Sequence, residues 1–211
     1  MTDISQLILD ILVFVLPLWF ANAAPTILGG GPPIDGGRLW KDGKRILGDG
    51  KTIRGFWVAV LIGIIIGILI AGLVNFFLDG SILDLSPVDF RLDYQKYYSG
   101  SIAYNLLNML NMSTLLSEPL MLGGVTGGIT AFGGMTGDMI GSFIKRRSGI
   151  PRGKTFVFLD QLGFLVLGMV LVFPIIPWPI EWLLFLVPIT FLTHIAANLF
   201  GYITGIQDDP L

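Results

Sequence analysis

Long apolar runs separated by short polar segments dominate the sequence. Five of these runs approach the roughly 20 residues that an apolar helix needs to cross the hydrocarbon core of a bilayer. They cover residues 4–28, 56–78, 120–144, 156–178 and 181–203. We expect a bend near Pro17 and the end of the first helix around Pro25, because proline interrupts the helical hydrogen-bond ladder. The pattern predicts an all-α integral membrane protein with five transmembrane helices, in which residues 1–211 form a single polytopic domain.

The longest connection between predicted spans contains a shorter apolar run, from Ile102 to Leu116. Asn105, Asn108 and Asn111 recur at every third position among leucines and methionines. About 15 apolar-rich residues are too few for an ordinary span. We therefore predict an interfacial helix that lies flat on the membrane within a long outer loop.

Composition agrees with lipid as the main solvent of this chain. Hydrophobic residues make up 53% and charged residues only 13%, about half the charged share of an average soluble domain. The chain has no cysteine, which excludes disulfides, thiolate zinc sites and a cysteine nucleophile. Any metal site must therefore use oxygen ligands or the single histidine. As a separate expectation, we predict no nucleic acid partner.

The positive charges occupy two glycine-containing loops. Of 13 Lys and Arg residues, six lie in residues 29–55 and five in residues 145–155. Because loops rich in Lys and Arg stay in the cytoplasm, we predict that both basic loops are cytoplasmic. The N-terminus then lies outside, and a site built from these loops faces the cytoplasm of a multi-pass cell-membrane protein.

Two acidic residues lie inside predicted spans near this cytoplasmic face. Asp138 precedes Lys145 by seven residues, about 10 Å along a helix, and Ser142 lies between them on the same helical face. Asp160 lies at a similar depth in the next span. A carboxylate buried in a bilayer costs several kcal/mol, and two facing acids favour a cation between them. The pattern predicts Mg²⁺ held by Asp138 and Asp160; the alternative is a structural ion pair of Asp138 with Lys145 or Arg146.

Glycines at four-residue spacing fill the third predicted span, including Gly123, Gly127, Gly133 and Gly137. Such spacing is typical of closely packed membrane helices. The first basic loop is also rich in glycine, as in backbones that wrap phosphates. A Walker motif is excluded there, because Arg45 stands where its first glycine is required.

Two stretches resemble a known enzyme family. Residues 137–161, GDMIGSFIKRRSGIPRGKTFVFLDQ, resemble the cytidylyltransferase signature of bacterial CDP-diacylglycerol synthases. The matching positions are Asp138, Ser142, Lys145, Arg146 and Asp160. The chain is more similar still to archaeal CDP-archaeol synthases, whose first loop resembles NAAPTILGGGPPIDGG and GDGKTIRGF. This resemblance covers essentially the whole chain.

The resemblance implies a reaction of CTP with unsaturated archaetidic acid, an isoprenoid ether-lipid phosphate, to give CDP-archaeol and pyrophosphate. The attacking lipid phosphate is already anionic near neutral pH, so the step needs no strong base. It needs Mg²⁺ and cations that neutralise phosphate charge. We expect Asp138, Lys145 and Asp160 to be catalytic. The substrate-binding candidates are Asn22, Asp35, Lys51, Thr52, Arg54, Ser142 and Arg146.

One departure from the bacterial signature and two alternative functions matter. The bacterial acidic motif continues as DRxD, whereas Asp160 is followed by Gln161, so the bacterial ligands of a second metal do not carry over. The alternatives are a CTP-dependent polyprenol kinase, which would release CDP, and a cation transporter using the two acids. A transporter of the common type would show repeated halves, and no clear repeat is present.

Overall fold

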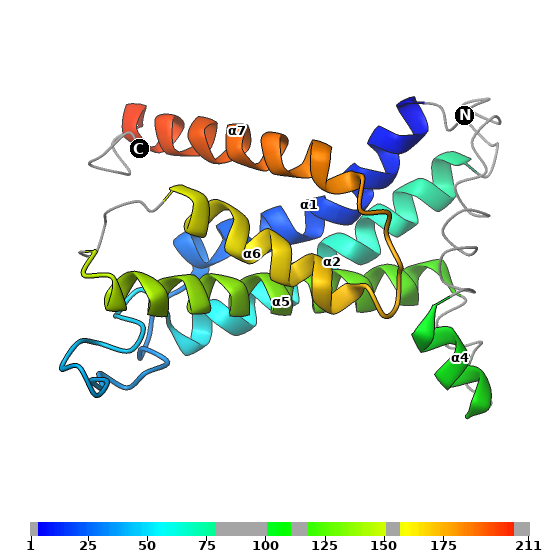
Figure 1. Ribbon diagram of the computed structural model, residues 1–211. Helices are drawn as coiled ribbons and strands as arrows, with labels where there is room; N and C mark the ends of the chain where they lie inside the picture. The colour runs from blue at the N-terminus through cyan, green and yellow to red at the C-terminus, as the bar shows by residue number, and fades with distance from the viewer. Residues whose placement is uncertain (1–3, 79–100, 111–117, 151–156, 205–211) are drawn as a thin grey trace.

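The computed structural model describes residues 4–78, 101–110, 118–150 and 157–204. Within these residues the secondary structure consists of helices and two isolated β-bridges. The helices are α1 (Ile4–Leu28), α2 (Ile53–Leu78), α4 (Ile102–Met109), α5 (Pro119–Arg147), α6 (Val157–Val172) and α7 (Trp182–Ile203). The predicted all-α class is therefore confirmed over these residues. Figure 1 shows five long helices running along one axis, with the short α4 at one end.

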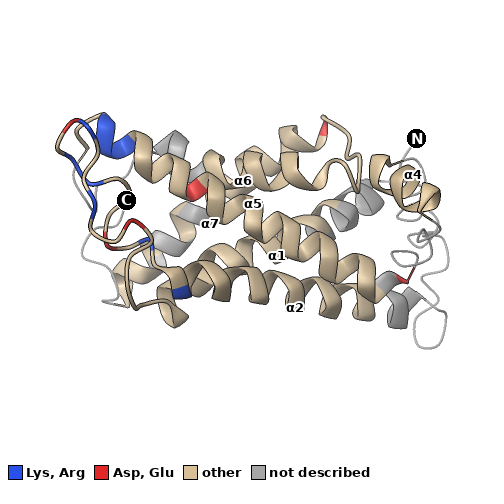
Figure 2. Cartoon of the chain, turned by 90° about the horizontal axis from the view of Figure 1, so that it is seen from below, with Lys and Arg blue, Asp and Glu red and all other residues tan. Residues whose placement is uncertain are grey.

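The two ends of the bundle differ in charge. The connection between α1 and α2 lies at the end where α5 finishes and α6 begins, while α4 and the turn between α6 and α7 lie at the opposite end (Figure 1). Lys and Arg residues gather around that connection and the end of α5 (Figure 2). We call this end the basic end. The first basic loop, residues 29–55, and the first basic residues of the second loop, 145–147, therefore lie at the same end.

α1 covers the predicted span 4–28 without ending around Pro25, and α2 begins earlier than predicted. α1 continues past Pro25, because a proline lacks the N–H but keeps its carbonyl, which accepts the Gly29 N–H at 2.9 Å. α2 begins at Ile53, three residues before its predicted start. Thr52 caps it by accepting the Gly55 N–H on its hydroxyl at 3.1 Å.

The other boundaries differ at the C-terminal ends. α5 continues to Arg147, so the basic run predicted to open loop 145–155 forms its last turn, where cations favourably meet the carbonyl end of a helix. α6 ends at Val172 instead of residue 178, because Pro174 cannot continue the ladder. α7 agrees within one residue. α4 ends at Met109 with Leu110 as its C-cap; residues 111–116 of the predicted interfacial helix lie outside the described residues.

Glycines bring α5 into backbone contact with the helices on either side. A Cβ added to Gly67 of α2 would lie 2.1 Å from the carbonyl oxygen of Gly123. A Cβ added to Gly137 would lie 2.2 Å from the carbonyl oxygen of Gly163 in α6. Both distances are far below van der Waals contact, so the predicted role of these glycines in close helix packing is confirmed.

The core lies between α1, α6 and α7, whereas α2 turns much of its apolar surface outward. Val15, Phe164 and Leu186 are almost completely buried together. Leu61 and Leu69 of α2 are more than half exposed. Within the described residues one helical segment, Ile53–Leu73, is long and apolar enough to cross a membrane. Shorter apolar helical stretches cover Phe14–Leu28, Leu162–Val172 and Trp182–Thr193. Extensive exposed apolar surface of this kind marks contact with lipid or another protein.

Candidate active site

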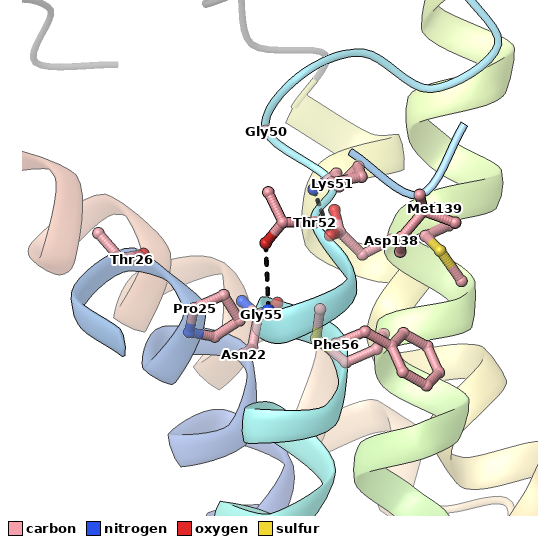
Figure 3. Close-up of a pocket in the computed structure, with 12 residues that line it drawn as sticks. Asn22, Pro25, Thr26, Gly50, Lys51, Thr52, Gly55, Phe56, Asp138 and Met139 are labelled. Atoms are coloured by element: carbon pink, nitrogen blue, oxygen red, sulfur yellow. Dashed lines mark hydrogen bonds and ion pairs between the residues drawn. The ribbon is translucent and has the colours of Figure 1, made fainter. Parts of the chain in front are cut away.

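A polar cavity of about 280 Å³ opens at the basic end, where α1, α2 and α5 meet. α1 contributes its last turns, α2 its first turn and α5 the stretch Met135–Met139, about two turns before its end, while the loop before α2 closes one side (Figure 3). The lining residues are Asn22, Pro25, Thr26, Ile34, Gly50, Lys51, Thr52, Gly55, Phe56, Met135, Asp138 and Met139. Cavities of ligand size commonly combine an apolar wall with a few converging polar groups, and this cavity has that composition.

The central feature of the cavity is an ion pair between Lys51 and Asp138. The Lys51 ammonium contacts the Asp138 carboxylate, and Figure 3 shows the two side chains pointing toward each other from the loop and from α5. Their side chains are 25% and 21% exposed, so both charges remain accessible from the cavity. The alternative pairing predicted from the sequence, with Lys145 or Arg146, is not the one formed.

Backbone pairing holds Lys51 at the mouth of the cavity. The Ile34 N–H donates to the Lys51 carbonyl at 2.8 Å, and the Ile53 N–H donates to the Pro32 carbonyl at 3.2 Å. Residues around Pro33 thus run antiparallel to those around Thr52. This short pairing places the lysine one residue before the helix cap, where its side chain reaches across to α5.

Asp35 organises the remainder of the same loop. Its carboxylate accepts hydrogen bonds from the Arg45 guanidinium at 2.8 and 3.3 Å. It also accepts the backbone N–H groups of Gly37, Leu47 and Gly48 at 3.0–3.1 Å. The side chain is fully shielded from solvent and is not among the cavity-lining residues. The Arg45 guanidinium and these N–H donors hold the pKa of the Asp35 carboxyl well below its usual range, although burial acts in the opposite direction.

Asp35→Asn is expected to loosen the first loop without unfolding the helices. The amide keeps the shape of the carboxyl but removes the charge that binds Arg45, and each hydrogen bond to a charged group contributes about 1.5–3 kcal/mol. Limited proteolysis within residues 38–54 at neutral pH should accelerate by about tenfold or more. Asp49→Asn is the matched control, because Asp49 also pairs with Arg45 at 2.8 Å but is 58% exposed. Equal cleavage of both variants would contradict the role assigned to Asp35.

The same carboxylate makes loop order dependent on pH. Because the folded-state pKa of Asp35 is depressed, its stabilisation is fully present above the ordinary aspartate pKa of about 4. It is lost progressively as the pH falls below that value toward the folded pKa. Hydrogen-exchange protection of the Leu47 and Gly48 amides should therefore decrease below about pH 4 in the native chain. It should already be low, and independent of pH, in the Asp35→Asn variant.

The end of α5 clamps the loop from the opposite side. Arg147 forms an ion pair with Asp42 at 2.8 Å and donates to the Arg45 carbonyl. Its guanidinium lies 4.7 Å from the centre of the Phe143 ring, and Lys44 donates to the Arg147 carbonyl at 3.3 Å. Arg45 therefore connects Arg147 with Asp35, because its carbonyl accepts from Arg147 and its guanidinium donates to Asp35. The roles of Arg45 and Arg147 were not predicted from the sequence. Basic residues near a membrane are common, and the sequence does not indicate which acidic residue each of them contacts.

The remaining predicted site residues divide between the cavity and its surroundings. Asn22 of α1 and Thr52, which caps α2, line the cavity beside Lys51 and Asp138. Arg54, Ser142 and Lys145 lie nearby on α2 and α5 but are not among the lining residues.

Two further predicted residues lie at the junction of α5 and α6. Arg146 donates Nη1 to the Ile150 carbonyl at 3.0 Å, and its buried Nε has no hydrogen-bond partner within the described residues. Asp160 belongs to the first turn of α6 at the basic end (Figure 1), and its side chain lies outside the described part. Sequence reasoning missed Met135, Met139 and Phe56, which have no polar signal.

Among the described residues, Asp138 supplies the carboxylate that lines the cavity and could bind a divalent cation. Within the described residues, no three Asp, Glu, His or Cys side chains gather into a metal-binding group. Mg²⁺ commonly uses only one or two protein carboxylates together with substrate phosphates. The Asp138 carboxylate binds the Lys51 ammonium, and the same oxygen atoms are of the type that Mg²⁺ takes as ligands. The donor set therefore fits an ion that arrives with a phosphate-bearing substrate.

Comparison with known proteins identifies the relatives of this chain. The family model described as CarS-like CDP-archaeol synthase matches residues 4–92 and 95–211. The CDP-archaeol synthase of Pyrococcus horikoshii is 39% identical over 203 residues, which cover 96% of each chain. The CDP-archaeol synthase of Methanococcus aeolicus is 36% identical over 206 residues, which cover 98% of each chain.

A solved structure agrees with these sequence matches. It is described as an intramembrane enzyme for archaeal membrane lipids biosynthesis, and it aligns with a TM-score of 0.64 at 30% identity. The alignment covers 91% of this chain and 94% of the other. A membrane setting therefore accounts for the exposed apolar surface of α2. The chain belongs to the CDP-archaeol synthase family.

Proposed function

We propose that this protein transfers the cytidylyl group of CTP to an archaeal ether-lipid phosphate. An oxygen of the lipid phosphate attacks the α-phosphorus of CTP, the bond from that phosphorus to the bridging oxygen breaks, and pyrophosphate leaves with the bond electrons. The product is a CDP-lipid. Family membership and relatives that are CDP-archaeol synthases support this reaction. Unsaturated archaetidic acid is the lipid phosphate we propose, by the same resemblance.

The observation that carries the proposal is the accessible pair of Lys51 and Asp138 in a cavity at the basic end. An ammonium can bind phosphate oxygens, and an adjacent carboxylate can bind the cation that accompanies a triphosphate. Asn22 supplies an uncharged amide on the opposite wall. Lys and Arg residues gather at this end of the bundle (Figure 2), and such a concentration of positive charge would attract an anionic nucleotide.

We propose Mg²⁺ as the cofactor, held by Asp138 with Asp160 as a second candidate ligand. When bound, the ion would neutralise phosphate charge and favour the departure of pyrophosphate. Lys51 binds phosphate oxygens and shields the approach of one anion to another. Arg146, which lies beside Gly48 of the first loop, is a further candidate to bind phosphate. Loop residues around Asp35 keep Lys51 in reach.

The proposed arrangement in the membrane has five transmembrane helices, an outside N-terminus and the basic end in the cytoplasm. It is supported by the position of α4 and of the turn before α7 at the end opposite to the basic residues (Figures 1 and 2). Charge bias sets such orientation in most membrane proteins.

Single cysteines test this orientation, because the native chain has none. Lys44→Cys and Glu181→Cys replace exposed residues near opposite ends of the bundle. On intact cells an impermeant thiol reagent should label position 181 strongly and position 44 weakly, and permeabilised cells should give equal labelling. Preferential labelling of position 44 on intact cells would reverse the topology.

One assay tests the reaction. Purified protein in detergent receives Mg²⁺, CTP labelled in the α-phosphate and an isoprenoid ether-lipid phosphate. We expect equal amounts of pyrophosphate and labelled lipid. Release of CDP with phosphorylated lipid would indicate a kinase instead. Cation flux in vesicles without either product would indicate a transporter.

A further inference from the structure

A second, apolar hollow lies between α2 and α5, farther from the basic end than the polar cavity. Its volume is about 480 Å³, and apolar side chains and glycines line it. Val60, Ile64 and Ile68 of α2 form one wall at four-residue spacing. Gly124, Gly128 and Phe132 repeat the same spacing along the other wall on α5. We call this hollow the α2–α5 groove.

The glycines along this contact meet different parts of α2. Gly127 must be glycine because an added Cβ would lie 2.2 Å from the Gly63 carbonyl oxygen. By contrast, a Cβ at Gly128 would meet only the Ile64 side chain, at 2.8 Å from Cγ1, and one at Gly124 would meet Ile68 at 3.0 Å. Cγ1 lies next to the backbone in a β-branched side chain, which is stiff, so Ile64 and Ile68 pack directly onto Gly128 and Gly124. The two glycines and the two isoleucines all line the groove, and a larger residue in place of either glycine would push an isoleucine into it.

The groove and the polar cavity meet at a pair of aromatic rings. Phe132 lines the groove and Phe56 lines the cavity. Their ring centres are 5.4 Å apart in an edge-to-face arrangement. Met135 and Met139 continue the same stripe of α5 from Phe132 into the cavity. A molecule with a polar head in the cavity can therefore extend an apolar tail along the groove past the two rings.

The dimensions match one lipid chain that starts at the head-group level. From Leu120 to Phe132 the groove follows 12 residues of α5, or about 18 Å at 1.5 Å per residue. One leaflet of hydrocarbon is about 15 Å thick, half of the bilayer core. Phe132 and Ile68 are 42% and 39% exposed, so the groove is open along its side and a chain can enter laterally from the membrane.

We propose that the α2–α5 groove binds one isoprenoid chain of the lipid phosphate whose head group occupies the cavity of Lys51 and Asp138. This assignment rests on the proposed function. The apolar walls of the groove contact the hydrocarbon chain. The Phe56–Phe132 pair lies where the chain joins the head group. Lipid selectivity then depends on α2 and α5, whereas nucleotide binding depends on the basic end.

Filling the groove tests the assignment. Ile68→Trp and, independently, Ile64→Trp place a large ring within it. The controls are Leu69→Trp and Ile65→Trp, which alter neighbouring exposed positions outside the lining. The KM for a long-chain isoprenoid lipid phosphate should rise by about tenfold or more in the groove variants, because each buried methylene contributes to affinity. The KM for CTP, and for a soluble short-chain lipid phosphate, should change less than twofold. Equal KM values in groove and control variants would overturn the proposal.

Photo-crosslinking without CTP separates this proposal from the proposed reaction. The probe is an isoprenoid lipid phosphate with a diazirine at the far end of one chain. Labelling should concentrate on residues 120–128 and 64–68, persist in Leu69→Trp and disappear in Ile68→Trp, even if the protein transferred no nucleotide. Uniform labelling of exposed helices would mean that only bulk lipid fills the groove. Copy-to-copy crosslinks in place of lipid labelling would assign it to a second copy of the chain, and either result would overturn the proposal.

Discussion

Asp138→Asn is expected to lower the rate of nucleotide transfer by about 100-fold or more while the helices remain folded. The carboxylate lines the cavity and is accessible to a cation. Loss of a single group that stabilises charge at the reacting atoms commonly costs a factor of 10²–10³ in rate. The asparagine keeps the size of the side chain, so the packing of α5 is preserved. The measurement is the initial rate of labelled CDP-lipid formation over a Mg²⁺ titration, using protein that elutes as a single detergent-solubilised species.

Asp49→Asn provides the control for loss of one negative charge at the basic end. Asp49 pairs with Arg45 at an exposed position outside the cavity, and exposed ion pairs contribute little. Its rate should stay within about twofold of the native rate. Near-normal transfer by Asp138→Asn at ordinary Mg²⁺ concentrations would remove Asp138 from the metal site. The ion pair with Lys51 would then be its only role.

A double variant separates the two roles of this ion pair. If Lys51 and Asp138 only neutralise each other, removing both charges in Lys51→Met/Asp138→Asn should restore activity relative to either single variant. If one binds phosphate and the other binds a cation, the double variant should be at least as inactive as the worse single variant. We expect the second result.

Lys51→Ala should raise the KM for CTP by about tenfold or more, and more than the KM for the lipid phosphate. The lysine side chain binds phosphate as a compact point charge, and charge-assisted hydrogen bonds are about twice as strong as neutral ones. Its backbone is held by the Ile34 N–H, which the substitution leaves in place. Steady-state rates with each substrate varied in turn provide the measurement.

Lys41→Ala tests whether any positive charge in the loop would give the same result. Lys41 is exposed in the same loop but does not line the cavity, so both KM values should change less than twofold. A rise only in the lipid KM of Lys51→Ala would assign Lys51 to the lipid phosphate. Unchanged KM values for both substrates would leave the lysine with a topological role alone.

Much of the helical frame follows from local sequence. Apolar length and charge placement predicted five long helices and put the basic segments at one end, because both properties are read along a single stretch of chain. The predicted end of α6 was wrong, since a run that remained apolar past Val172 was interrupted by Pro174. The start of α2 was predicted late because Thr52 caps a polar turn, and hydropathy does not detect a cap.

The sequence predicted only some of the residues of the candidate site. Asp138 stood out because an acid within an apolar helix is costly, and Lys51 stood out within a glycine-rich basic loop. Their mutual contact joins positions 87 residues apart, and no local spacing encodes it. Asp35 was predicted as a substrate-binding residue, yet its carboxylate is buried among the hydrogen bonds of the loop. That position depends on how residues 36–48 fold back around it.

The sequence by itself determined which segments become apolar helices, where the glycines allow close approach and which end carries the positive charge. Each of these three features depends on the residues of one segment and on whether that segment lies in lipid or water. Only the tertiary structure decided that Lys51 meets Asp138, and that Gly124 and Gly128 pack against isoleucines that line a groove while Gly123 and Gly127 meet a neighbouring backbone. These outcomes depend on the rotation and crossing of α2 against α5. That geometry is set by the packing of many side chains together, so no single stretch of sequence specifies it.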